Sequence, residues 1–337
     1  MAVDKKYEAD VAAILSHRYD QGGTLWDTPD HRLQKGAPFS TLDCVSYLLE
    51  LGMAPEEPIL KEAADLILSA WQEDGRIRLY PKGSIYPCHT ACAAQVLCHL
   101  GYANDGRLQT TFRYFLETQY PDGGWRCRKF SFGHGPETEY SNPHPTLLAL
   151  DAFRFSDYLN QEPALDRAVE FLLEHWTIKK PIGPCHYGIG TLFMQVEYPF
   201  RNYNLFEYVY ILSFYARARK DPRFLEAFHE LEARTVNGQI VVERVVPKLA
   251  KRTGDKALYG NTRSLEEGAV SQSVPKKRVL CQLQIMLQPF PKCQDPRIRT
   301  LLFHFQGIHF IRVKLSVIEK LSLRLIGSVA IGDDVGI

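Results

Sequence analysis

Gln119-Tyr120-Pro121-Asp122-Gly123-Gly124-Trp125 decides the fold, because it ends one amphipathic helix and leads toward the next. Before it, apolar residues recur at helical spacing, namely Leu108, Phe112, Phe115 and Leu116. Proline and the glycine pair stop that helix, since glycine adopts positive φ at little cost. The tryptophan then supplies a large ring that can fold back over the helix end. This stretch predicts a turn between two packed helices.

Less complete versions of the same turn recur along the chain. They are Gln21 to Trp26, Trp71 to Arg76, His175-Trp176-Thr177 and Val236-Asn237-Gly238. Equivalent positions are separated by roughly 50 residues, a period typical of stacked supersecondary units. Each unit reads as a helical hairpin, and the expected helices are 40–51 with 58–71, 87–100 with 106–119, 143–158 with 163–176, and 202–219 with 222–233. The sequence therefore predicts about five αα-hairpin repeats.

The two helices of each pair differ in character. The first is apolar on nearly every side, as in 88–98 and 205–212, so it must be surrounded by protein. The second is amphipathic, as in 61–68 and 166–173, so one of its sides faces solvent. Alternation of this kind predicts an inner ring within an outer ring, an all-α α/α toroid; an open solenoid is the competing arrangement.

Composition narrows the class of protein. Hydrophobic residues make up 45% of the chain and charged residues 23%, as in ordinary globular proteins. A net charge of +1 is too small to attract nucleic acid through the overall electrostatic field of the protein. No apolar run reaches the roughly 18 residues that span a bilayer, and residues 1–6 lack the apolar core expected of a signal peptide. Eight cysteines are few for a disulfide framework, so we expect a cytoplasmic protein with reduced thiols.

Residues 251–337 depart from the repeat pattern. They carry 14 Lys and Arg against 7 Asp and Glu, whereas residues 1–250 carry 26 against 32. We therefore expect a repeat domain over 1–250 and an atypical, basic C-terminal extension over 251–337. The extension could be a poorly ordered or atypical cap of the repeats, or a basic binding arm.

The repeated Gln-x-x-x-Gly-Gly-x-Trp type of turn resembles that of the prenyltransferase and squalene–hopene cyclase superfamily, whose fold is an α/α toroid. The likeness covers about residues 10–245, and the chain looks most like small stand-alone bacterial prenyltransferase/squalene-oxidase-repeat proteins. It implies an isoprenoid substrate. The Asp-x-Asp-Asp motif with which class II cyclases protonate an alkene is missing from the sequence. Asp43-Cys44 is adjacent, unlike the Asp-x-Cys pair that holds zinc in protein prenyltransferases.

Polar residues distributed over several repeats are the candidates for chemistry. They open successive predicted inner helices or the loop that follows, and they are Asp43, Cys88, His89, His144, Cys185, His186 and Tyr187. If the inner helices are parallel, these side chains meet at one mouth, where imidazoles can transfer protons and helix N-termini favour an anion such as diphosphate. Zinc or magnesium is a possible cofactor, although no short ligand spacing marks a metal site. Purely structural roles are the alternative.

Two further groups are candidates for binding or catalysis. The connection 126–142, at roughly 17 residues, exceeds the usual helix–helix loop. Within it Arg126 and Arg128, with Lys129, could clamp phosphate, and Glu139 could act as acid or base. Aromatic residues crowd 193–215, and Tyr198 and Tyr203 are the best candidates to line a cavity, where π faces stabilise cations. A solvated loop and ordinary core packing are the respective alternatives.

Together these patterns favour an isoprenoid-handling enzyme, cyclase-like or prenyltransferase-like, that holds a long apolar substrate in a central cavity. The expected catalytic residues are His89, Glu139, His144 and His186. The rival hypothesis is a non-catalytic toroid that binds a lipid or a protein partner.

Overall fold

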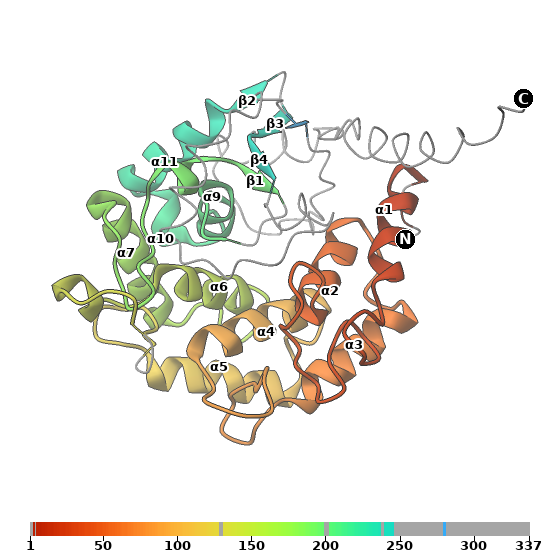
Figure 1. The fold of residues 1–337 in the computed structure, drawn as a ribbon. Coiled ribbons are helices and arrows are strands. Elements are labelled where there is room, and N and C mark those ends of the chain that lie inside the picture. The colour runs from red at the N-terminus through yellow and green to blue at the C-terminus, as the bar shows by residue number, and fades with distance from the viewer. Residues whose placement is uncertain are drawn as a thin grey trace, which may run out of the picture.

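The computed structural model describes residues 3, 5–127, 131–198, 202–236, 239–245 and 279–280, and these confirm a mainly helical chain. Figure 1 shows paired helices that follow an arc in two layers. The inner layer consists of α2 (Thr41–Glu50), α4 (Pro87–His99), α6 (Pro143–Phe153) and α9 (Leu205–Leu212). The outer layer consists of α3 (Pro58–Ser69), α5 (Gly106–Thr118), α7 (Pro163–Ile178) and α11 (Pro222–Glu232). Consecutive inner helices pack on one another, α2 on α4, α4 on α6 and α6 on α9.

Shorter elements connect the pairs or lie at the ends of the arc. The helical ones are η1 (Lys5–Tyr7), α1 (Glu8–Ser16), η2 (Pro136–Glu139), α8 (Thr191–Met194) and α10 (Ala216–Arg219). The strands are β1 (Glu197–Tyr198), β2 (Thr235–Val236), β3 (Gln239–Val242), β4 (Arg244–Val245) and β5 (Val279–Leu280). β1 pairs with β4 in parallel, and β3 pairs antiparallel with β2 and β5. No helix in the described part of the chain is long and apolar enough to cross a membrane.

Most helix boundaries lie where the sequence predicted them. Five helices begin at the expected proline, whose fixed φ and missing N–H suit the first helical position, namely Pro58, Pro87, Pro143, Pro163 and Pro222. The expected extension over 251–337 lies outside the described residues except for β5.

Two predicted helices are shorter than expected, for local reasons. α6 ends at Phe153 rather than at 158, because Ser156 Oγ accepts a hydrogen bond from the Leu159 N–H and forms a turn instead. The helix predicted over 202–219 is interrupted. Asn204 caps α9 by accepting from the Glu207 N–H at 2.9 Å, and α9 ends where Ser213 Oγ donates to the Tyr210 carbonyl.

The turn Gln119–Trp125, called here the Gly-Gly turn, joins three helices. Trp125 Nε1 donates to the Phe115 carbonyl of α5 at 2.9 Å, and its backbone N–H donates to Thr146 Oγ1 of α6 at 3.1 Å. Gln119 Nε2 donates to the Ala164 carbonyl of α7 at 2.7 Å, and its Oε1 accepts from Arg167. One short stretch therefore ties an outer helix to the next inner and outer helices.

Glycine is required in this turn because two backbones approach closely. Gly123 has a φ of +94°, and a Cβ there would overlap the carbonyl oxygen of Arg167 on α7. Gly75 occupies the equivalent position one repeat earlier, with a φ of +85°, and its Cβ would lie 2.8 Å from the Thr110 carbonyl oxygen of α5. In both repeats the glycine lets the turn seat directly on the backbone of the next outer helix.

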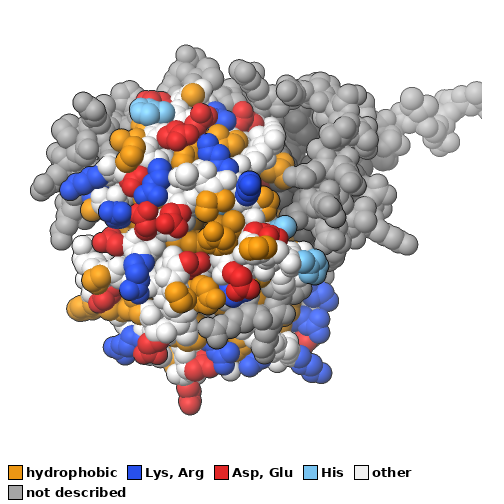
Figure 2. All heavy atoms as spheres, turned by 90° about the vertical axis from the view of Figure 1, so that its left-hand side faces the viewer, with side chains coloured by type: hydrophobic (Ala, Val, Ile, Leu, Met, Phe, Trp, Pro, Cys, Tyr) orange, Lys and Arg blue, Asp and Glu red, His pale blue; other side chains and the backbone are white. Residues whose placement is uncertain are grey.

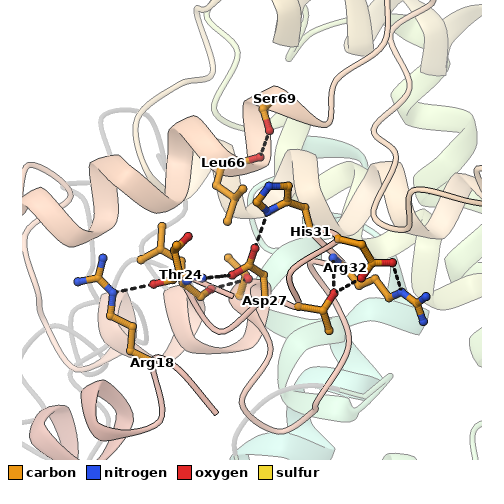
Figure 3. Close-up of polar contacts among 11 residues, drawn as sticks. Arg18, Thr24, Asp27, His31, Arg32, Leu66 and Ser69 are labelled. Carbon is orange, nitrogen blue, oxygen red and sulfur yellow. Dashed lines mark hydrogen bonds and ion pairs between the residues drawn. The ribbon is translucent and has the colours of Figure 1, made fainter. Parts of the chain in front are cut away.

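The first of the related turns, shown in Figure 3, is organised by a buried carboxylate. Asp27 Oδ1 accepts from the backbone N–H groups of Thr24 and Leu25 at 2.8 and 2.9 Å, and Oδ2 contacts His31 Nδ1 at 2.7 Å. Arg18 Nε donates to the Thr24 carbonyl. The tryptophan again closes the turn, since Trp26 Nε1 donates to the Ile14 carbonyl of α1 at 3.0 Å, as Trp125 does to α5.

The outer helices present a mixed charged surface, as their amphipathic sequences predict. On the face shown in Figure 2, acidic and basic side chains alternate with small apolar areas. Glu170 of α7 pairs with Arg217 at 2.6 Å and with Arg223 at 2.7 Å, which links α7 to α10 and α11. Exposed pairs of this kind contribute little to stability, so the packing of the two layers depends mainly on apolar burial.

Replacing Gly123 with Ala tests the close approach of the turn to α7. Gly101 has a φ of +89° but open space around the position of a Cβ, so Gly101→Ala measures the backbone strain alone, about 1–2 kcal/mol. Gly123→Ala adds the overlap with Arg167, and we expect it to cost at least about 2 kcal/mol more. Urea denaturation of both variants measures the difference. Equal losses of stability would show that the approach to α7 carries no constraint.

Candidate functional site

The inner helices α4, α6 and α9 run parallel, because their contacts match at both ends. Near the N-termini, the Asn142 side chain before α6 accepts from the Cys185 N–H at 3.0 Å, and Cys185 lies close enough to Cys88 of α4 to influence its pKa. Toward the C-termini, His99 of α4 contacts Asp151 of α6. α9 follows the same direction, since His144 approaches Glu207. Three inner helices thus place their N-termini at one end of the arc, called here the N-terminal end.

His144 lies in the second position of α6 among groups from three other segments. Its Nε2 is 3.8 Å from Glu207 Oε2 of α9. Its ring centre is 5.6 Å from that of Tyr187 and 6.2 Å from that of Tyr203. Burial lowers the pKa of His144 to about 4, so this imidazole is neutral at pH 7. His144 is therefore a neutral proton acceptor with a carboxylate and two aromatic rings around it.

His89 and Cys88 lie at the same end of α4 but in a separate contact group. The rings of Tyr80 and Tyr86 are 5.4 and 5.0 Å from that of His89. Burial lowers the pKa of His89 to about 4 and raises that of Cys88 to about 12, with Cys185 and Cys127 adding to the latter shift. The thiol stays protonated at neutral pH, which disfavours a thiolate nucleophile.

The loop that carries Cys185, His186 and Tyr187 divides its side chains between two directions. Tyr187 exchanges backbone hydrogen bonds with Ile182 and turns its ring toward His144. His186, with a φ of +55°, instead lies 3.4 Å from Glu137 Oε1 of η2. Burial raises the pKa of Cys185 to about 11. The three predicted histidines thus lie at one end of the arc, each with different neighbours.

The candidates of the loop 126–142 pair with each other at the surface. Arg126 Nη1 contacts Glu139 Oε2 and Tyr120 Oη, both at 3.0 Å, and the guanidinium lies over the Tyr120 ring. Glu139 is exposed. Arg128 lies outside the described residues. The phosphate-binding and acid–base roles of this group stay predictions.

Asp43 and Tyr203 are buried, whereas Tyr198 is described only by its backbone in β1. Asp43, with an exposed fraction of 3%, lies in the first turn of α2. Tyr203 Oη lies 3.0 Å from His175 Nδ1. Because His175 Nε2 must donate to the Lys180 carbonyl, its Nδ1 accepts the tyrosine proton. Burial lowers the pKa of His175 to about 4. Sequence analysis missed this third neutral histidine, since an outer helix gave no reason to expect one.

Cys88, a predicted site residue, begins a row of half-buried residues on α4 whose other members were not predicted. Cys88, Cys92, Gln95 and His99 share one side of the helix, and we call them the concave stripe. Burial raises the pKa of Cys92 to about 12, with added contributions from Cys88 and from Glu207 of α9. α6 packs between α4 and α9, so Cys92 and Glu207 influence each other across the inner side of the arc. The sequence signal for this row is the spacing i, i+4, i+7, i+11, which places residues on one side of a helix. It was overlooked because cysteine was counted as an apolar residue.

The stripe ends at a polar group that we call the Asp151 cluster, made of Gln95, His99, Asp151 and Arg154. Asp151 Oδ2 accepts from Gln95 Nε2 at 2.9 Å and contacts His99 Nε2 at 2.7 Å, and its Oδ1 accepts from Arg154 Nε at 2.5 Å. Burial alone would raise the pKa of Asp151, but Arg154 and His99 hold it below its usual range. The carboxylate is therefore ionised, paired and almost completely buried.

The donor set gives no support for a metal centre. Across the described ranges, no group of three or more His, Cys, Asp and Glu side chains is arranged to hold a metal ion. Zinc or magnesium, which the sequence left open as a cofactor, accordingly enters none of the steps proposed below.

Comparison with protein families and with curated proteins was made by sequence. No protein-family model matches the chain, and no curated protein matches it significantly. The superfamily resemblance of the Gly-Gly turns stays a prediction.

The neutral histidines predict a loss of stability in mild acid. His89, His144 and His175 have pKa values of about 4 when folded and about 6.5 when unfolded. Between these values the unfolded chain binds more protons, so the free energy of unfolding falls as pH falls, by up to about 1.4 kcal/mol per pH unit for each histidine. Urea denaturation at several pH values between 7 and 5 measures this slope.

Two glutamine variants identify the source of the slope. His144→Gln should reduce it, because one buried imidazole is removed, whereas His229→Gln should leave it unchanged, because that side chain is exposed on α11. A stability that does not change between pH 7 and 5 would contradict the neutral, buried state of these histidines.

Proposed function

We propose that the chain is an isoprenoid-handling enzyme of the cyclase type, in which the helical hairpins close into an α/α toroid around a central apolar cavity. The two-layered arc of inner and outer helices supports this architecture. The aromatic rings at the N-terminal end are suited to pack against an apolar substrate and to stabilise a carbocation. The observation that carries the proposal is the position of His144, between the Glu207 carboxylate and the rings of Tyr187 and Tyr203.

The weak basicity of His144 selects the chemistry. An imidazole with a pKa of about 4 takes a proton only from a strong acid, and a thiol whose pKa is raised to about 11 or 12 is not one. A carbocation is a strong acid at the carbon next to its charge. This difference in acidity favours the deprotonation of a carbocation over cysteine-based catalysis or transfer to a thiolate.

The proposed step closes the reaction after a cation has formed. The C–H bond next to the cationic carbon breaks, its electron pair forms a carbon–carbon double bond, and the proton passes to the His144 imidazole. The imidazolium then faces the Glu207 side chain, whose Oε2 lies 3.8 Å from His144 Nε2. Before that step, the ring faces of Tyr187 and Tyr203 stabilise the cation. The roles predicted for His89, His186 and Glu139 stay predictions, because their described contacts lie elsewhere.

One observation favours the second candidate, a toroid that binds an apolar ligand without changing it. The half-buried rings Phe155, Tyr210 and Phe214 lie near the opposite ends of α6 and α9, away from His144. Such rings provide an apolar wall against which a ligand could pack. A lipid recovered unaltered from the purified protein would support this candidate.

Incubation with farnesyl diphosphate, geranylgeranyl diphosphate and squalene, followed by gas chromatography with mass spectrometry, tests the enzyme proposal. We expect an olefin product from at least one substrate. His144→Gln should reduce its formation at least about 100-fold, because general-base catalysis contributes about that much. His229→Gln, on the outer surface, should keep the activity. Turnover unchanged in His144→Gln, or no turnover of any substrate, would overturn the proposal.

A further inference from the structure

The N-terminal end of the inner layer also carries the connections that lead from an outer helix to the next inner helix. The connections before α2 and before α4 lie side by side, because the Leu33 N–H donates to the Leu79 carbonyl at 3.0 Å. The connection before α6 leads to the same end, because α6 is parallel to α4. The described residues of three successive connections therefore share this end, namely 17–40, 70–86 and 119–142.

Large apolar side chains are exposed mainly in these connections. Among the described residues, the large apolar side chains with an exposed fraction of 37% or more are Tyr19, Phe132, Tyr140, Tyr158 and Leu225. The first three belong to the connections at the N-terminal end. Tyr158 lies in a connection at the opposite end, between α6 and α7, and Leu225 lies on α11. Single exposed apolar residues are common, but three at one end indicate a contact surface.

The segments that carry these rings are fixed by hydrogen bonds. The Phe132 N–H donates to the Pro184 carbonyl at 2.7 Å. Tyr140 directly precedes Ser141, whose N–H donates to Asp122 Oδ2 of the Gly-Gly turn at 2.7 Å. Rings on an anchored backbone lose less conformational freedom when a partner covers them, so these rings are prepared for binding.

Basic side chains dominate two of the same connections. Residues 31–40 and 75–86 contain five Lys and Arg and no Asp or Glu. Two of the five, Arg32 and Arg76, pair with acidic residues that precede these stretches, at 2.9 and 2.5 Å. The other three form no ion pair with any described residue, and they are Lys35, Arg78 and Lys82.

The three unpaired cations are accessible to a partner. The side chains of Lys35 and Lys82 are exposed. Arg78 Nη1 donates to the Gly83 carbonyl at 3.0 Å in a contact that is itself exposed. The exposed Glu73, in the connection before α4, offsets one of the three charges. Two positive charges therefore remain in excess beside the exposed rings.

Aromatic rings and cations on one surface match the chemistry of a membrane that contains anionic lipid. Tyrosine rings are favoured at the level of the lipid headgroups, where an apolar body meets water. Lysine and arginine are attracted to the negative potential of an anionic leaflet. Both kinds of side chain are distributed over three connections rather than gathered in one pocket, so they fit an extended surface better than a small ligand.

We propose that the N-terminal end of the inner layer is a docking surface for a bilayer that contains anionic phospholipid. Its cations are Lys35, Arg78 and Lys82, and its apolar contacts are Tyr19, Phe132 and Tyr140. The proposal concerns where the protein binds rather than which reaction it catalyses, so it stands independently of the proposed function.

Vesicle flotation of the full chain tests the docking surface. Vesicles of phosphatidylcholine alone are compared with vesicles that contain about 30% phosphatidylglycerol, in about 0.05 and 0.5 M salt. We expect the protein to bind the anionic vesicles more tightly than the neutral ones in low salt. High salt should weaken that binding, because it screens the attraction of exposed charges.

Two double variants with the same change of net charge locate the binding surface. Lys35→Gln with Lys82→Gln should weaken binding to anionic vesicles about 25-fold, because each basic residue near such a surface contributes about fivefold. Lys61→Gln with Lys220→Gln is the matched control. Lys61 lies in the first turn of α3 and Lys220 just before α11, so both belong to the opposite end. The control should bind as the wild-type protein does.

A second pair of variants tests the rings. Phe132→Ser should weaken binding about three- to fivefold at both salt concentrations, because salt does not screen the burial of an apolar ring. Tyr158→Ser, at the opposite end, should leave binding unchanged.

The basic residues 251–337 make the paired variants decisive, because binding through them would persist in Lys35→Gln with Lys82→Gln and would overturn the proposal. No binding to anionic vesicles, or equal losses in the two lysine variants, would also overturn it. Binding of RNA without binding of vesicles would assign the surface to a soluble polyanion instead. Circular dichroism and thermal unfolding establish that each variant is folded.

Discussion

The architecture depends on the close approach of a turn to the backbone of the next outer helix. In the Gly-Gly turn, Gly123 lies against the carbonyl of Arg167, and Gln119 donates to the neighbouring Ala164 carbonyl. Both groups belong to the first turns of α7 and are fixed by the backbone. The spacing between the outer helices α5 and α7 is therefore set by these hydrogen bonds and by the contact of Gly123 with α7. Trp125, which is hydrogen-bonded to α5 and to α6, sets the distance between the outer and inner layers.

Sequence reasoning located the repeats because their signals are local. Proline at a helix start and glycine pairs at a turn act through the backbone of a few residues, which is why five helices begin at the predicted proline. It failed where a side chain overrides the periodic pattern. The stretch 205–215 is rich in apolar and aromatic residues, yet Asn204 and Ser213 satisfy backbone groups locally and limit the helix there to 205–212. Hydrophobic periodicity contains no information about such competing hydrogen bonds.

The site was predictable in part for the same reason. Placing His89, His144 and the loop of His186 at one end required only parallel inner helices. Their neighbours could not be predicted, because His186 turns toward Glu137 while Tyr187 turns toward His144. Asp151 and His99 were hidden by a different cause, since each occurs singly in a helix that otherwise reads as apolar. His99 and Asp151 are 52 positions apart in sequence and lie on different helices. The local patterns used here cannot predict which of many polar residues meet across such a distance.

Parallel packing of α4, α6 and α9 makes the two ends of the inner layer electrostatically different. The aligned backbone dipoles give the N-terminal end a positive potential and the C-terminal end a negative one. A positive potential disfavours an imidazolium, so it acts in the same direction as burial on His89 and His144. At the other end the negative potential favours the guanidinium of Arg154, which in turn keeps Asp151 ionised. The helix direction that the repeats impose therefore suits neutral imidazoles at one end of the inner layer and a buried carboxylate paired with a guanidinium at the other.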